Sequence, residues 1–307
     1  MKRLKSKSRK SKVLVLGVLV GLLLWVAVSA RAQLISLFDL GMGVRPAGMG
    51  EAFTGLADDE NALFYNPAGL ALLTKISMNT LYESHFGASD YLTAAFGGPS
   101  FGAGLLFFNF RAMARRDAQD QEVGTFGYSH FALIGALGMR GLPGLRTLEN
   151  LALGLKLKFY RVNTLAEGSG TGLALDPSFM LTLRDVGPAK DLRLGAMIEN
   201  LLSLGVRYGN NRVERWRLGL RFGVSANLLG RFKTAVDLSA GGLHLGSEVP
   251  VSTDFGQLFV RLGALTRGGL SLSVGLGFEF RSFRVDYAFI AHPQLTDSHR
   301  LSIAFEF

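Results

Sequence analysis

The chain of 307 residues contains no cysteine. This absence excludes a disulfide framework, thiol catalysis and a cysteine-ligated zinc site. It suits an exported protein, because such a chain need not meet the oxidising machinery of the periplasm. Long hydrophobic runs are also missing beyond the first 32 residues, where no stretch approaches the roughly 20 apolar residues of a spanning helix.

Patterns that carry chemistry are absent as well. The five histidines are scattered without metal-ligand spacing, and no H-E-x-x-H motif occurs. Gly127-Tyr128-Ser129-His130-Phe131 lacks the glycine that a nucleophile elbow places two residues after its serine. Gly41-x-Gly43 lacks the third glycine of a dinucleotide-binding loop. We therefore expect no enzyme, and no catalytic, cofactor-binding or metal-binding residues.

The first 32 residues have the character of a targeting segment. Residues 1–12 hold seven basic residues and no acid, and residues 13–28 are apolar apart from two glycines. Ala30-Arg31-Ala32 has the small-x-small form that signal peptidase cuts. This pattern predicts a signal peptide over residues 1–32, removed after Ala32 or within two residues of it. An uncleaved membrane anchor is the alternative.

The positive charge of the chain lies in that segment. The chain has 33 Lys and Arg against 24 Asp and Glu, a net charge of +9. Residues 1–32 contain eight basic residues and no acid, so the mature chain has 25 against 24 and a net charge of +1. We therefore expect no nucleic-acid partner.

Apolar and polar residues alternate along the rest of the chain. In Leu270–Arg281, leucine, valine and phenylalanine alternate with serine, glycine and charged residues, and Leu151–Arg161 and Trp216–Val224 repeat the pattern. Successive side chains of a strand point to opposite sides, so each segment has one apolar and one polar face. This repetition predicts an all-β fold, an antiparallel transmembrane β-barrel with a wet interior.

Thirteen segments are expected to be strands. They are 76–83, 90–97, 101–110, 126–139, 151–163, 172–184, 191–200, 213–226, 231–241, 256–266, 270–281, 283–290 and 299–307. Bacterial single-chain barrels have an even number of strands, so one has been missed or merged, in 243–251 or in the long 126–139 run. We expect about 14 strands over residues 75–307, joined by short loops.

The last strand, His299–Phe307, places apolar side chains on one face and ends on an aromatic residue. A C-terminal strand ending in phenylalanine resembles the recognition signal of bacterial outer-membrane β-barrels. The resemblance implies an outer-membrane location, contact with outer-membrane lipids, and recognition of Phe307 by the barrel-assembly machinery.

Residues 33–74 differ from the strands that follow and are expected to form a plug inside the barrel. Asp58 or Asp59 can cap a short helix over Glu60–Leu63, and Asn66-Pro67 ends it. Capping is favoured over calcium binding, because the EF-hand spacing is absent. The apolar residues expected to anchor this segment on the inner wall are Phe64, Tyr65 and Leu70. A transport role and a purely bracing role stay open.

Residues 45–70 read R-P-A-G-M-G-E-A-F-T-G-L-A-D-D-E-N-A-L-F-Y-N-P-A-G-L. This run resembles the N-terminal signature of the PorV/PorQ family of outer-membrane proteins. It is more distantly similar to the N-terminal plug of FadL-type long-chain fatty-acid transporters, which carry a comparable A-D-D…N-P-A element. The resemblance implies a 14-stranded barrel whose N-terminal segment folds back into the lumen.

Basic residues on the polar faces of the strands have two interpretations. Their positions in the alternating pattern of the strands place Arg217, Arg221 and Arg261 in the lumen, together with several acids. They can pair across the lumen and brace the barrel, or form a basic strip that steers anionic head groups.

Asp176-Pro177 is a candidate lateral opening. Pro177 is the one proline expected inside a spanning strand, and proline cannot donate to the ladder. A kink there would let a hydrophobic ligand leave sideways into the membrane. FadL-type proteins are thought to release cargo laterally through an earlier strand. The alternative is a misplaced strand boundary, with Pro177 in a turn at the rim.

Two functions fit these features best. The first is a FadL-like passive channel for hydrophobic small molecules, with the N-terminal segment as its gate. The second is a PorV-like component of type IX protein secretion that attaches or shuttles exported proteins. A structural barrel without cargo is the third interpretation. Short loops argue against a large docking surface and so favour the channel.

Overall fold

The computed structural model describes residues 38, 40–85, 88–141, 149–164, 168–183, 189–293 and 297–307. The predicted signal peptide lies outside the described residues. The strands are β1 Ser77–His85, β2 Ser89–Gly98, β3 Phe101–Arg116, β4 Glu122–Arg140, β5 Leu151–Thr164, β6 Gly168–Leu183, β7 Ala189–Glu199, β8 Leu202–Tyr208, β9 Val213–Glu214, β10 Gly219–Leu228, β11 Phe232–Ser239, β12 Gly242–Thr253, β13 Gly256–Leu265, β14 Ser271–Phe280, β15 Phe283–Ala291 and β16 Ser298–Glu306. Short helices α2 (Val44–Gly48) and α3 (Ala62–Tyr65) and the 3₁₀ helix η2 (Pro67–Leu72) precede them.

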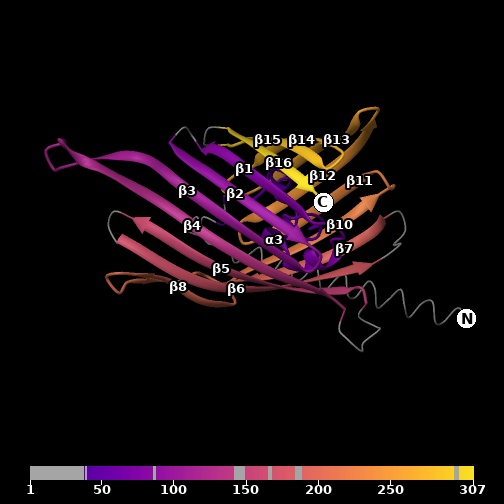
Figure 1. The fold of residues 1–307 in the computed structure, drawn as a ribbon, viewed down its shortest axis with the longest axis horizontal. Helices are drawn as coiled ribbons and strands as arrows, with labels where there is room; N and C mark the ends of the chain where they lie inside the picture. The colour runs from indigo at the N-terminus through magenta and orange to yellow at the C-terminus, as the bar shows by residue number, and fades with distance from the viewer. Residues whose placement is uncertain are drawn as a thin grey trace, which may run out of the picture.

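Fourteen of these sixteen strands, all but β8 and β9, form a closed ring (Figure 1). Each strand pairs with its neighbours in chain order, β7 pairs with β10, and β16 pairs antiparallel with β1. The ring leaves no open edge that would expose unpaired backbone groups to hydrocarbon. The predicted 14-stranded antiparallel barrel is confirmed. The strand missing from the prediction is β12, whereas the 126–139 run belongs to the single strand β4.

The side chains of the ring strands alternate as predicted. On β5, Leu155, Leu157 and Phe159 are exposed on the outside, while Lys156 and Lys158 are buried in the lumen. An apolar outer face and a polar inner face are what a barrel in lipid requires. Among the described helices, none is long and apolar enough to cross a membrane.

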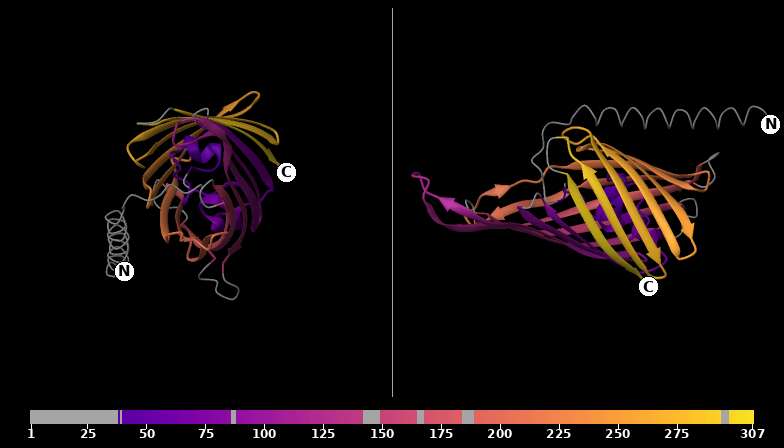
Figure 2. Two further views of the ribbon diagram at one scale, coloured as in Figure 1. Left: turned by 90° about the vertical axis from the view of Figure 1, so that its left-hand side faces the viewer. Right: turned by 90° about the horizontal axis from the view of Figure 1, so that it is seen from above.

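The two ends of the barrel differ. We call the end where β1 begins and β16 ends the terminal end, and the other the opposite rim. β3 and β4, of 16 and 19 residues, project from the opposite rim beyond their neighbours (Figure 1). The helices α2 and α3 lie within the ring, as the end-on view in Figure 2 shows.

Candidate functional site

The segment 40–73, called the plug below, forms short helices and turns inside the barrel. Its helix α3 begins at Ala62, two residues later than expected, and the prediction that an aspartate caps it is wrong. The side chains of Asp58 and Asp59 instead bind the guanidinium of Arg45, at 2.7 and 2.8 Å. Asp59 also accepts hydrogen bonds from the backbone and side chain of Asn61. Asp58 therefore organises the plug rather than capping a helix, whereas Asp59 also caps the turn that leads into α3.

Asn66 is the turning point of the plug. The chain leaves α3 there in an extended conformation, and Pro67 opens η2, where its missing N–H has no partner to lose. The side-chain oxygen of Asn66 accepts from the Ala68 N–H, and its amide nitrogen donates to the carbonyl of Thr54 and to that of Phe179 on β6. One side chain thus joins two parts of the plug to the wall.

The three expected anchors are buried between the plug and the wall. Phe64 and Tyr65 are 1% exposed and Leu70 is 0% exposed. The Tyr65 hydroxyl accepts from the Met42 N–H, and the Arg221 guanidinium lies 5.2 Å from the centre of its ring. The plug therefore has an apolar centre inside a polar lumen.

Side chains of the wall satisfy the backbone of the plug. Asp237 on β11 accepts from the backbone N–H groups of Phe53 and Thr54, at 2.9 and 2.7 Å. Lys156 on β5 donates to the carbonyl of Phe64 at 2.9 Å. A buried backbone group left without a partner costs about 1–3 kcal/mol, so such bonds hold the plug in one position.

Glycines of the wall let the plug backbone approach closely. A Cβ on Gly263 of β13 would lie 2.0 Å from the backbone nitrogen of Gly50. A Cβ on Gly195 of β7 would lie 2.2 Å from the carbonyl oxygen of Thr54. Both neighbours are backbone atoms that cannot swing aside. The plug is therefore packed directly against the wall, with no room for a side chain at these contacts.

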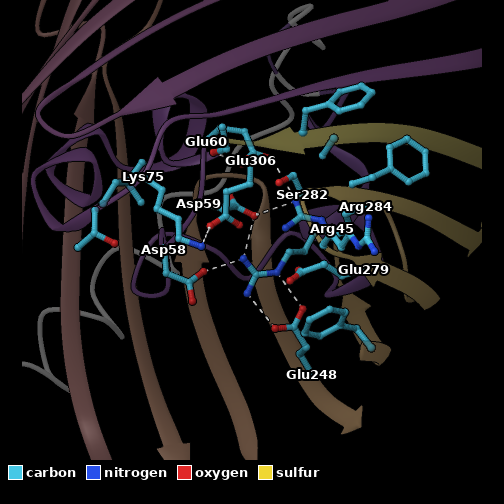
Figure 3. Close-up of a pocket in the computed structure, with 18 of the residues that line it drawn as sticks. Arg45, Asp58, Asp59, Glu60, Lys75, Glu248, Glu279, Ser282, Arg284 and Glu306 are labelled. Carbon is cyan, nitrogen blue, oxygen red and sulfur yellow. Dashed lines mark hydrogen bonds and ion pairs between the residues drawn. The ribbon is translucent and has the colours of Figure 1, made fainter. Parts of the chain in front are cut away.

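A network of buried ion pairs surrounds Arg45 near the terminal end (Figure 3). Arg45 also pairs with Glu248 on β12 at 2.8 Å, and Glu248 pairs with Arg261 on β13 at 2.7 Å. Arg284 on β15 binds Glu60 of the plug at 3.1 Å. Breaking a buried pair by removing one partner typically costs about 3–5 kcal/mol. The network therefore fixes the plug to β12, β13 and β15.

This network lines a cavity of about 380 Å³ that is rich in charges of both signs. Burial alone would raise the pKa of the Asp58 carboxyl, but Arg45 and Lys233 hold it well below its usual range. Burial and the neighbouring Asp59 raise the pKa of Glu60. The cavity is a polar pocket at the terminal end, and an apolar solute would have to displace paired charges to cross it.

The three arginines of the predicted basic strip have different surroundings. Arg261 is occupied by Glu248 and by Asp286, at 2.7 and 2.6 Å. Arg221 is buried against the plug, 4.0 Å from Glu199. Arg217 is exposed and lies between β9 and β10, outside both strands, so its predicted lumen-facing strand position is wrong. The ion pairs of Arg261 are those expected if it braces the barrel across the lumen.

The barrel wall is interrupted beside Pro177. β6 pairs with β7 over Ser178–Leu183 and with β8 over Gly170–Leu175, and Asp176 and Pro177 fall between the two ladders. Pro177 lies within β6, in register with Leu155 of β5. Pro177, which cannot donate a backbone hydrogen bond, thus lies where the adjacent segment between β7 and β8 stops pairing with β6.

A second interruption lies on the other side of β7 and β8. Pairing between β7 and β10 ends at Glu199–Gly219, and pairing between β8 and β9 starts at Val206–Glu214. The structure describes every residue from 189 to 293, and in this range no strand pairing joins residues 200–205 to residues 215–218. We call these two segments the wall break. Asn200 bridges it, since its N–H donates to Asp176 and its side-chain amide donates to the carbonyl of Arg217, at 2.7 and 2.9 Å.

Aromatic rings lead along the lumen to the wall break. Successive rings from β3, β4, β5 and the break lie 4.5 to 5.6 Å apart. We call them the aromatic row: Phe108, Phe110, Tyr128, His130, Tyr160 and Trp216. Tyr160 lies four residues nearer the opposite rim than Lys156, which touches the plug, so the row lies on the rim side of the plug.

The end of the aromatic row holds a phenylalanine of the N-terminal segment. The ring of Phe38 lies 6.0 Å from Tyr160 and 6.0 Å from Trp216, and the Lys158 ammonium lies 4.8 Å from its centre. Lys158 is itself paired with Asp176 at 2.8 Å. The end of the row therefore places an aromatic ring, that of Phe38, beside a lysine that shares its carboxylate partner with Lys156. The alternating pattern did not identify Trp216 as a lumen residue, because it places this residue on the lipid face.

The described residues contain no group of three or more His, Cys, Asp and Glu side chains that could hold a metal ion.

No protein-family model matches the chain, and no curated protein matches it. Solved structures match its fold. The toluene transporter TodX of P. putida is 12% identical and has a TM-score of 0.55, over 87% of this chain and 99% of TodX. The monoaromatic hydrocarbon channel CymD is 12% identical, with a TM-score of 0.54 over 87% and 97%. A Pseudomonas aeruginosa FadL homologue is 11% identical, with a TM-score of 0.51 over 87% and 98%. At this identity the similarity shows a shared fold, that of FadL-type barrels.

Replacing Gly263 by valine should push the plug away from the wall, because the new side chain would meet the backbone of Gly50. We expect higher ion conductance in planar bilayers and faster proteolysis of the plug. Gly135→Val is the matched control, since a Cβ at Gly135 of β4 meets nothing within 4 Å. Equal conductance of the Gly263→Val variant and the wild type would contradict the tight packing.

Replacing Arg45 by glutamine should lower the free energy of unfolding by about 3–5 kcal/mol, because buried carboxylates lose their partner. An acid with a lowered pKa stabilises the fold above its unfolded pKa, and this stability is lost as pH falls through the folded pKa. The wild-type plug should therefore resist proteolysis to well below pH ~3.9, the ordinary pKa of aspartate. The variant should lose its resistance at a higher pH.

The control for Arg45 is Arg281→Gln, which removes an exposed guanidinium from the lining of the same cavity. Denaturant titration in detergent micelles measures the stability, and limited proteolysis across pH measures release of the plug. Equal loss of stability in both variants would show that Arg45 has no special role.

Proposed function

We propose that this protein is a passive channel of the bacterial outer membrane for hydrophobic, chiefly aromatic, small molecules. The observation that carries the proposal is the aromatic row, which runs along the lumen and ends at the wall break. In this arrangement the projecting β3–β4 hairpin points to the cell exterior and the terminal end to the periplasm, since outer-membrane barrels have their longer loops outside.

The polar plug supports a sideways exit. A solute going straight through would have to displace the plug from the wall glycines and from the ion pairs of Arg45. Each such buried pair costs about 3–5 kcal/mol to break. The wall break has no strand pairing between 200–205 and 215–218, and the side chain of Asn200 crosses it with one hydrogen bond, to the carbonyl of Arg217. We infer that an apolar ligand passes from the aromatic row through the break into the membrane.

The fold likeness supports the same proposal. TodX is described as a toluene transporter and CymD as a monoaromatic hydrocarbon channel. The lumen of this chain offers the chemistry that such solutes need, since its rings provide apolar faces and edges. The Lys158 ammonium shares the Asp176 carboxylate with Lys156, and it lies against the face of an aromatic ring, that of Phe38, which a cation attracts.

A role in type IX secretion rests on the PorV/PorQ-like run over residues 45–70 alone, and a barrel without cargo has no observation in its favour. Recognition of Phe307 by the barrel-assembly machinery stays a prediction. In the folded barrel, the Phe307 N–H donates to the carbonyl of Ile76 at 2.8 Å.

Binding should be visible in intrinsic fluorescence, because the chain has two tryptophans and only Trp216 lies after residue 32. We expect saturable quenching of the purified protein by bromobenzene and none by the polar compound bromoethanol. Tyr160→Ala should weaken bromobenzene binding by about tenfold, the upper effect of one aromatic pair. Tyr82→Ala, which removes a ring exposed on the outer face, is the control. Linear, unsaturable quenching would contradict a binding site.

Restoring a hydrogen-bond donor at the break, with Pro177→Val, should close it partly and slow uptake of a fluorescent fatty acid or aromatic dye by cells. Barrel assembly should be unchanged, as judged by heat-modifiable mobility. Pro250 also lies inside a strand, β12, where it pairs with Phe259, so the expectation that Pro177 is the one proline within a strand is wrong. Pro250→Val is therefore the matched control, because β12 is remote in the ring from β6. Unchanged uptake in a correctly assembled Pro177→Val variant would remove the lateral route.

A further inference from the structure

Two arginines face outward on neighbouring strands near the opposite rim. Arg161 of β5 pairs in register with Thr171 of β6, and Thr171 pairs with Arg207 of β8. All three side chains are exposed, and their lumen-facing neighbours Tyr160 and Tyr208 are buried. The three residues therefore form one row across the outer face of the wall.

The spacing of this row suits an anionic group. Adjacent strands lie about 4.8 Å apart, so the two arginine backbones are about 10 Å apart with the threonine hydroxyl between them. Guanidinium groups on flexible side chains can converge over that distance and bind phosphate oxygens in bidentate fashion. No ion pair of Arg161 or Arg207 occurs among the described residues, so their charges are uncompensated.

The depth of the row matches the head-group level of a membrane. On each of the three strands, an exposed apolar side chain lies two or three residues nearer the terminal end. These side chains are Phe159, Leu173 and Leu204. At about 3.3 Å per residue, the arginines lie roughly 7–10 Å farther along their strands than these side chains, which is less along the membrane normal because barrel strands are tilted by about 35–45°. Arginines at that level meet lipid phosphates rather than acyl chains.

Apolar residues flank the basic row on the strands paired beside it. The same register row continues over β4, β3 and β2 with Phe131, Phe107 and Leu92, which are all apolar. On the other side Arg207 pairs with the exposed Val213 of β9, and the exposed Arg215 follows two residues later, in the wall break. The basic residues of this row are therefore those of β5 and β8.

We propose that Arg161, Thr171 and Arg207 form a docking site for a phosphate group of an anionic lipid in the outer leaflet. The bound lipid would lie beside the wall break, against β5, β6 and β8. This inference rests on the proposed outer-membrane location, but not on the transport of any solute.

The test compares lipid binding by the full barrel in phosphatidylcholine nanodiscs. The probe is lipid A carrying its phosphates, dephosphorylated lipid A is the matched lipid, and native mass spectrometry counts the lipid retained. We expect the wild type to retain phosphorylated lipid A preferentially. The Arg161→Gln/Arg207→Gln variant should bind it about thirtyfold more weakly, the effect of two basic residues at a charged surface.

Two further variants keep the result interpretable. Arg161→Lys/Arg207→Lys preserves charge and should recover part of the binding, which shows that loss is not misfolding. Arg231→Gln removes an exposed arginine beside β11 at the terminal end and should bind like the wild type. Equal retention by the wild type and the double glutamine variant would overturn the proposal, as would equal loss in Arg231→Gln or displacement of the lipid by inorganic phosphate.

Bromobenzene quenching of Trp216 in the same samples separates this inference from the channel proposal. In the wild type, saturable quenching without preferential retention of phosphorylated lipid A would overturn the lipid site alone. Preferential retention of phosphorylated lipid A without saturable quenching would overturn the channel alone.

Discussion

The backbone N–H and C=O groups buried in the wall and the plug must find partners within the protein, and most of the structure follows from that constraint. The wall meets it by closing, since β16 pairs with β1 and leaves no edge. The plug has little regular structure and cannot meet it alone. Its backbone groups are bound by wall side chains such as Asp237 and Lys156. The polar inner face of the strands thus has a structural purpose before any functional one.

The same constraint explains how much the sequence alone could predict. Alternation of period two identifies lipid-facing and lumen-facing residues, and from it the ring of strands could be predicted almost completely. β12 was missed because Ser247 interrupts the apolar face of 243–251 and a proline lies within the segment. The plug was predicted from its glycines and its Asn66-Pro67 turn. Its position against particular strands was not, because contacts such as Arg45 to Glu248 join residues 203 apart in the chain.

The alternating pattern predicted the wrong side-chain orientations at the point where the strand ends. Trp216–Val224 reads as one alternating strand, and so Trp216 was assigned to lipid and Arg217 to the lumen. The chain is irregular over 215–218, and the ring of Trp216 contacts Tyr160 in the lumen instead. No local sequence pattern predicts such a break. The break lies in the strand pairing of β6 and β10, which joins residues far apart in the sequence, and the candidate site lies there.

The position of the plug gives the closing of the ring a second consequence. Its contacts reach β5, β6 and β7 on one side and β10 to β16 on the other, so the ring surrounds it on all sides. A chain segment packed directly against wall glycines cannot be threaded into a finished cylinder through a mouth lined with paired charges. The pairing of β1 with β16 thus does more than remove an open edge, because the ring that it closes also encloses the N-terminal segment.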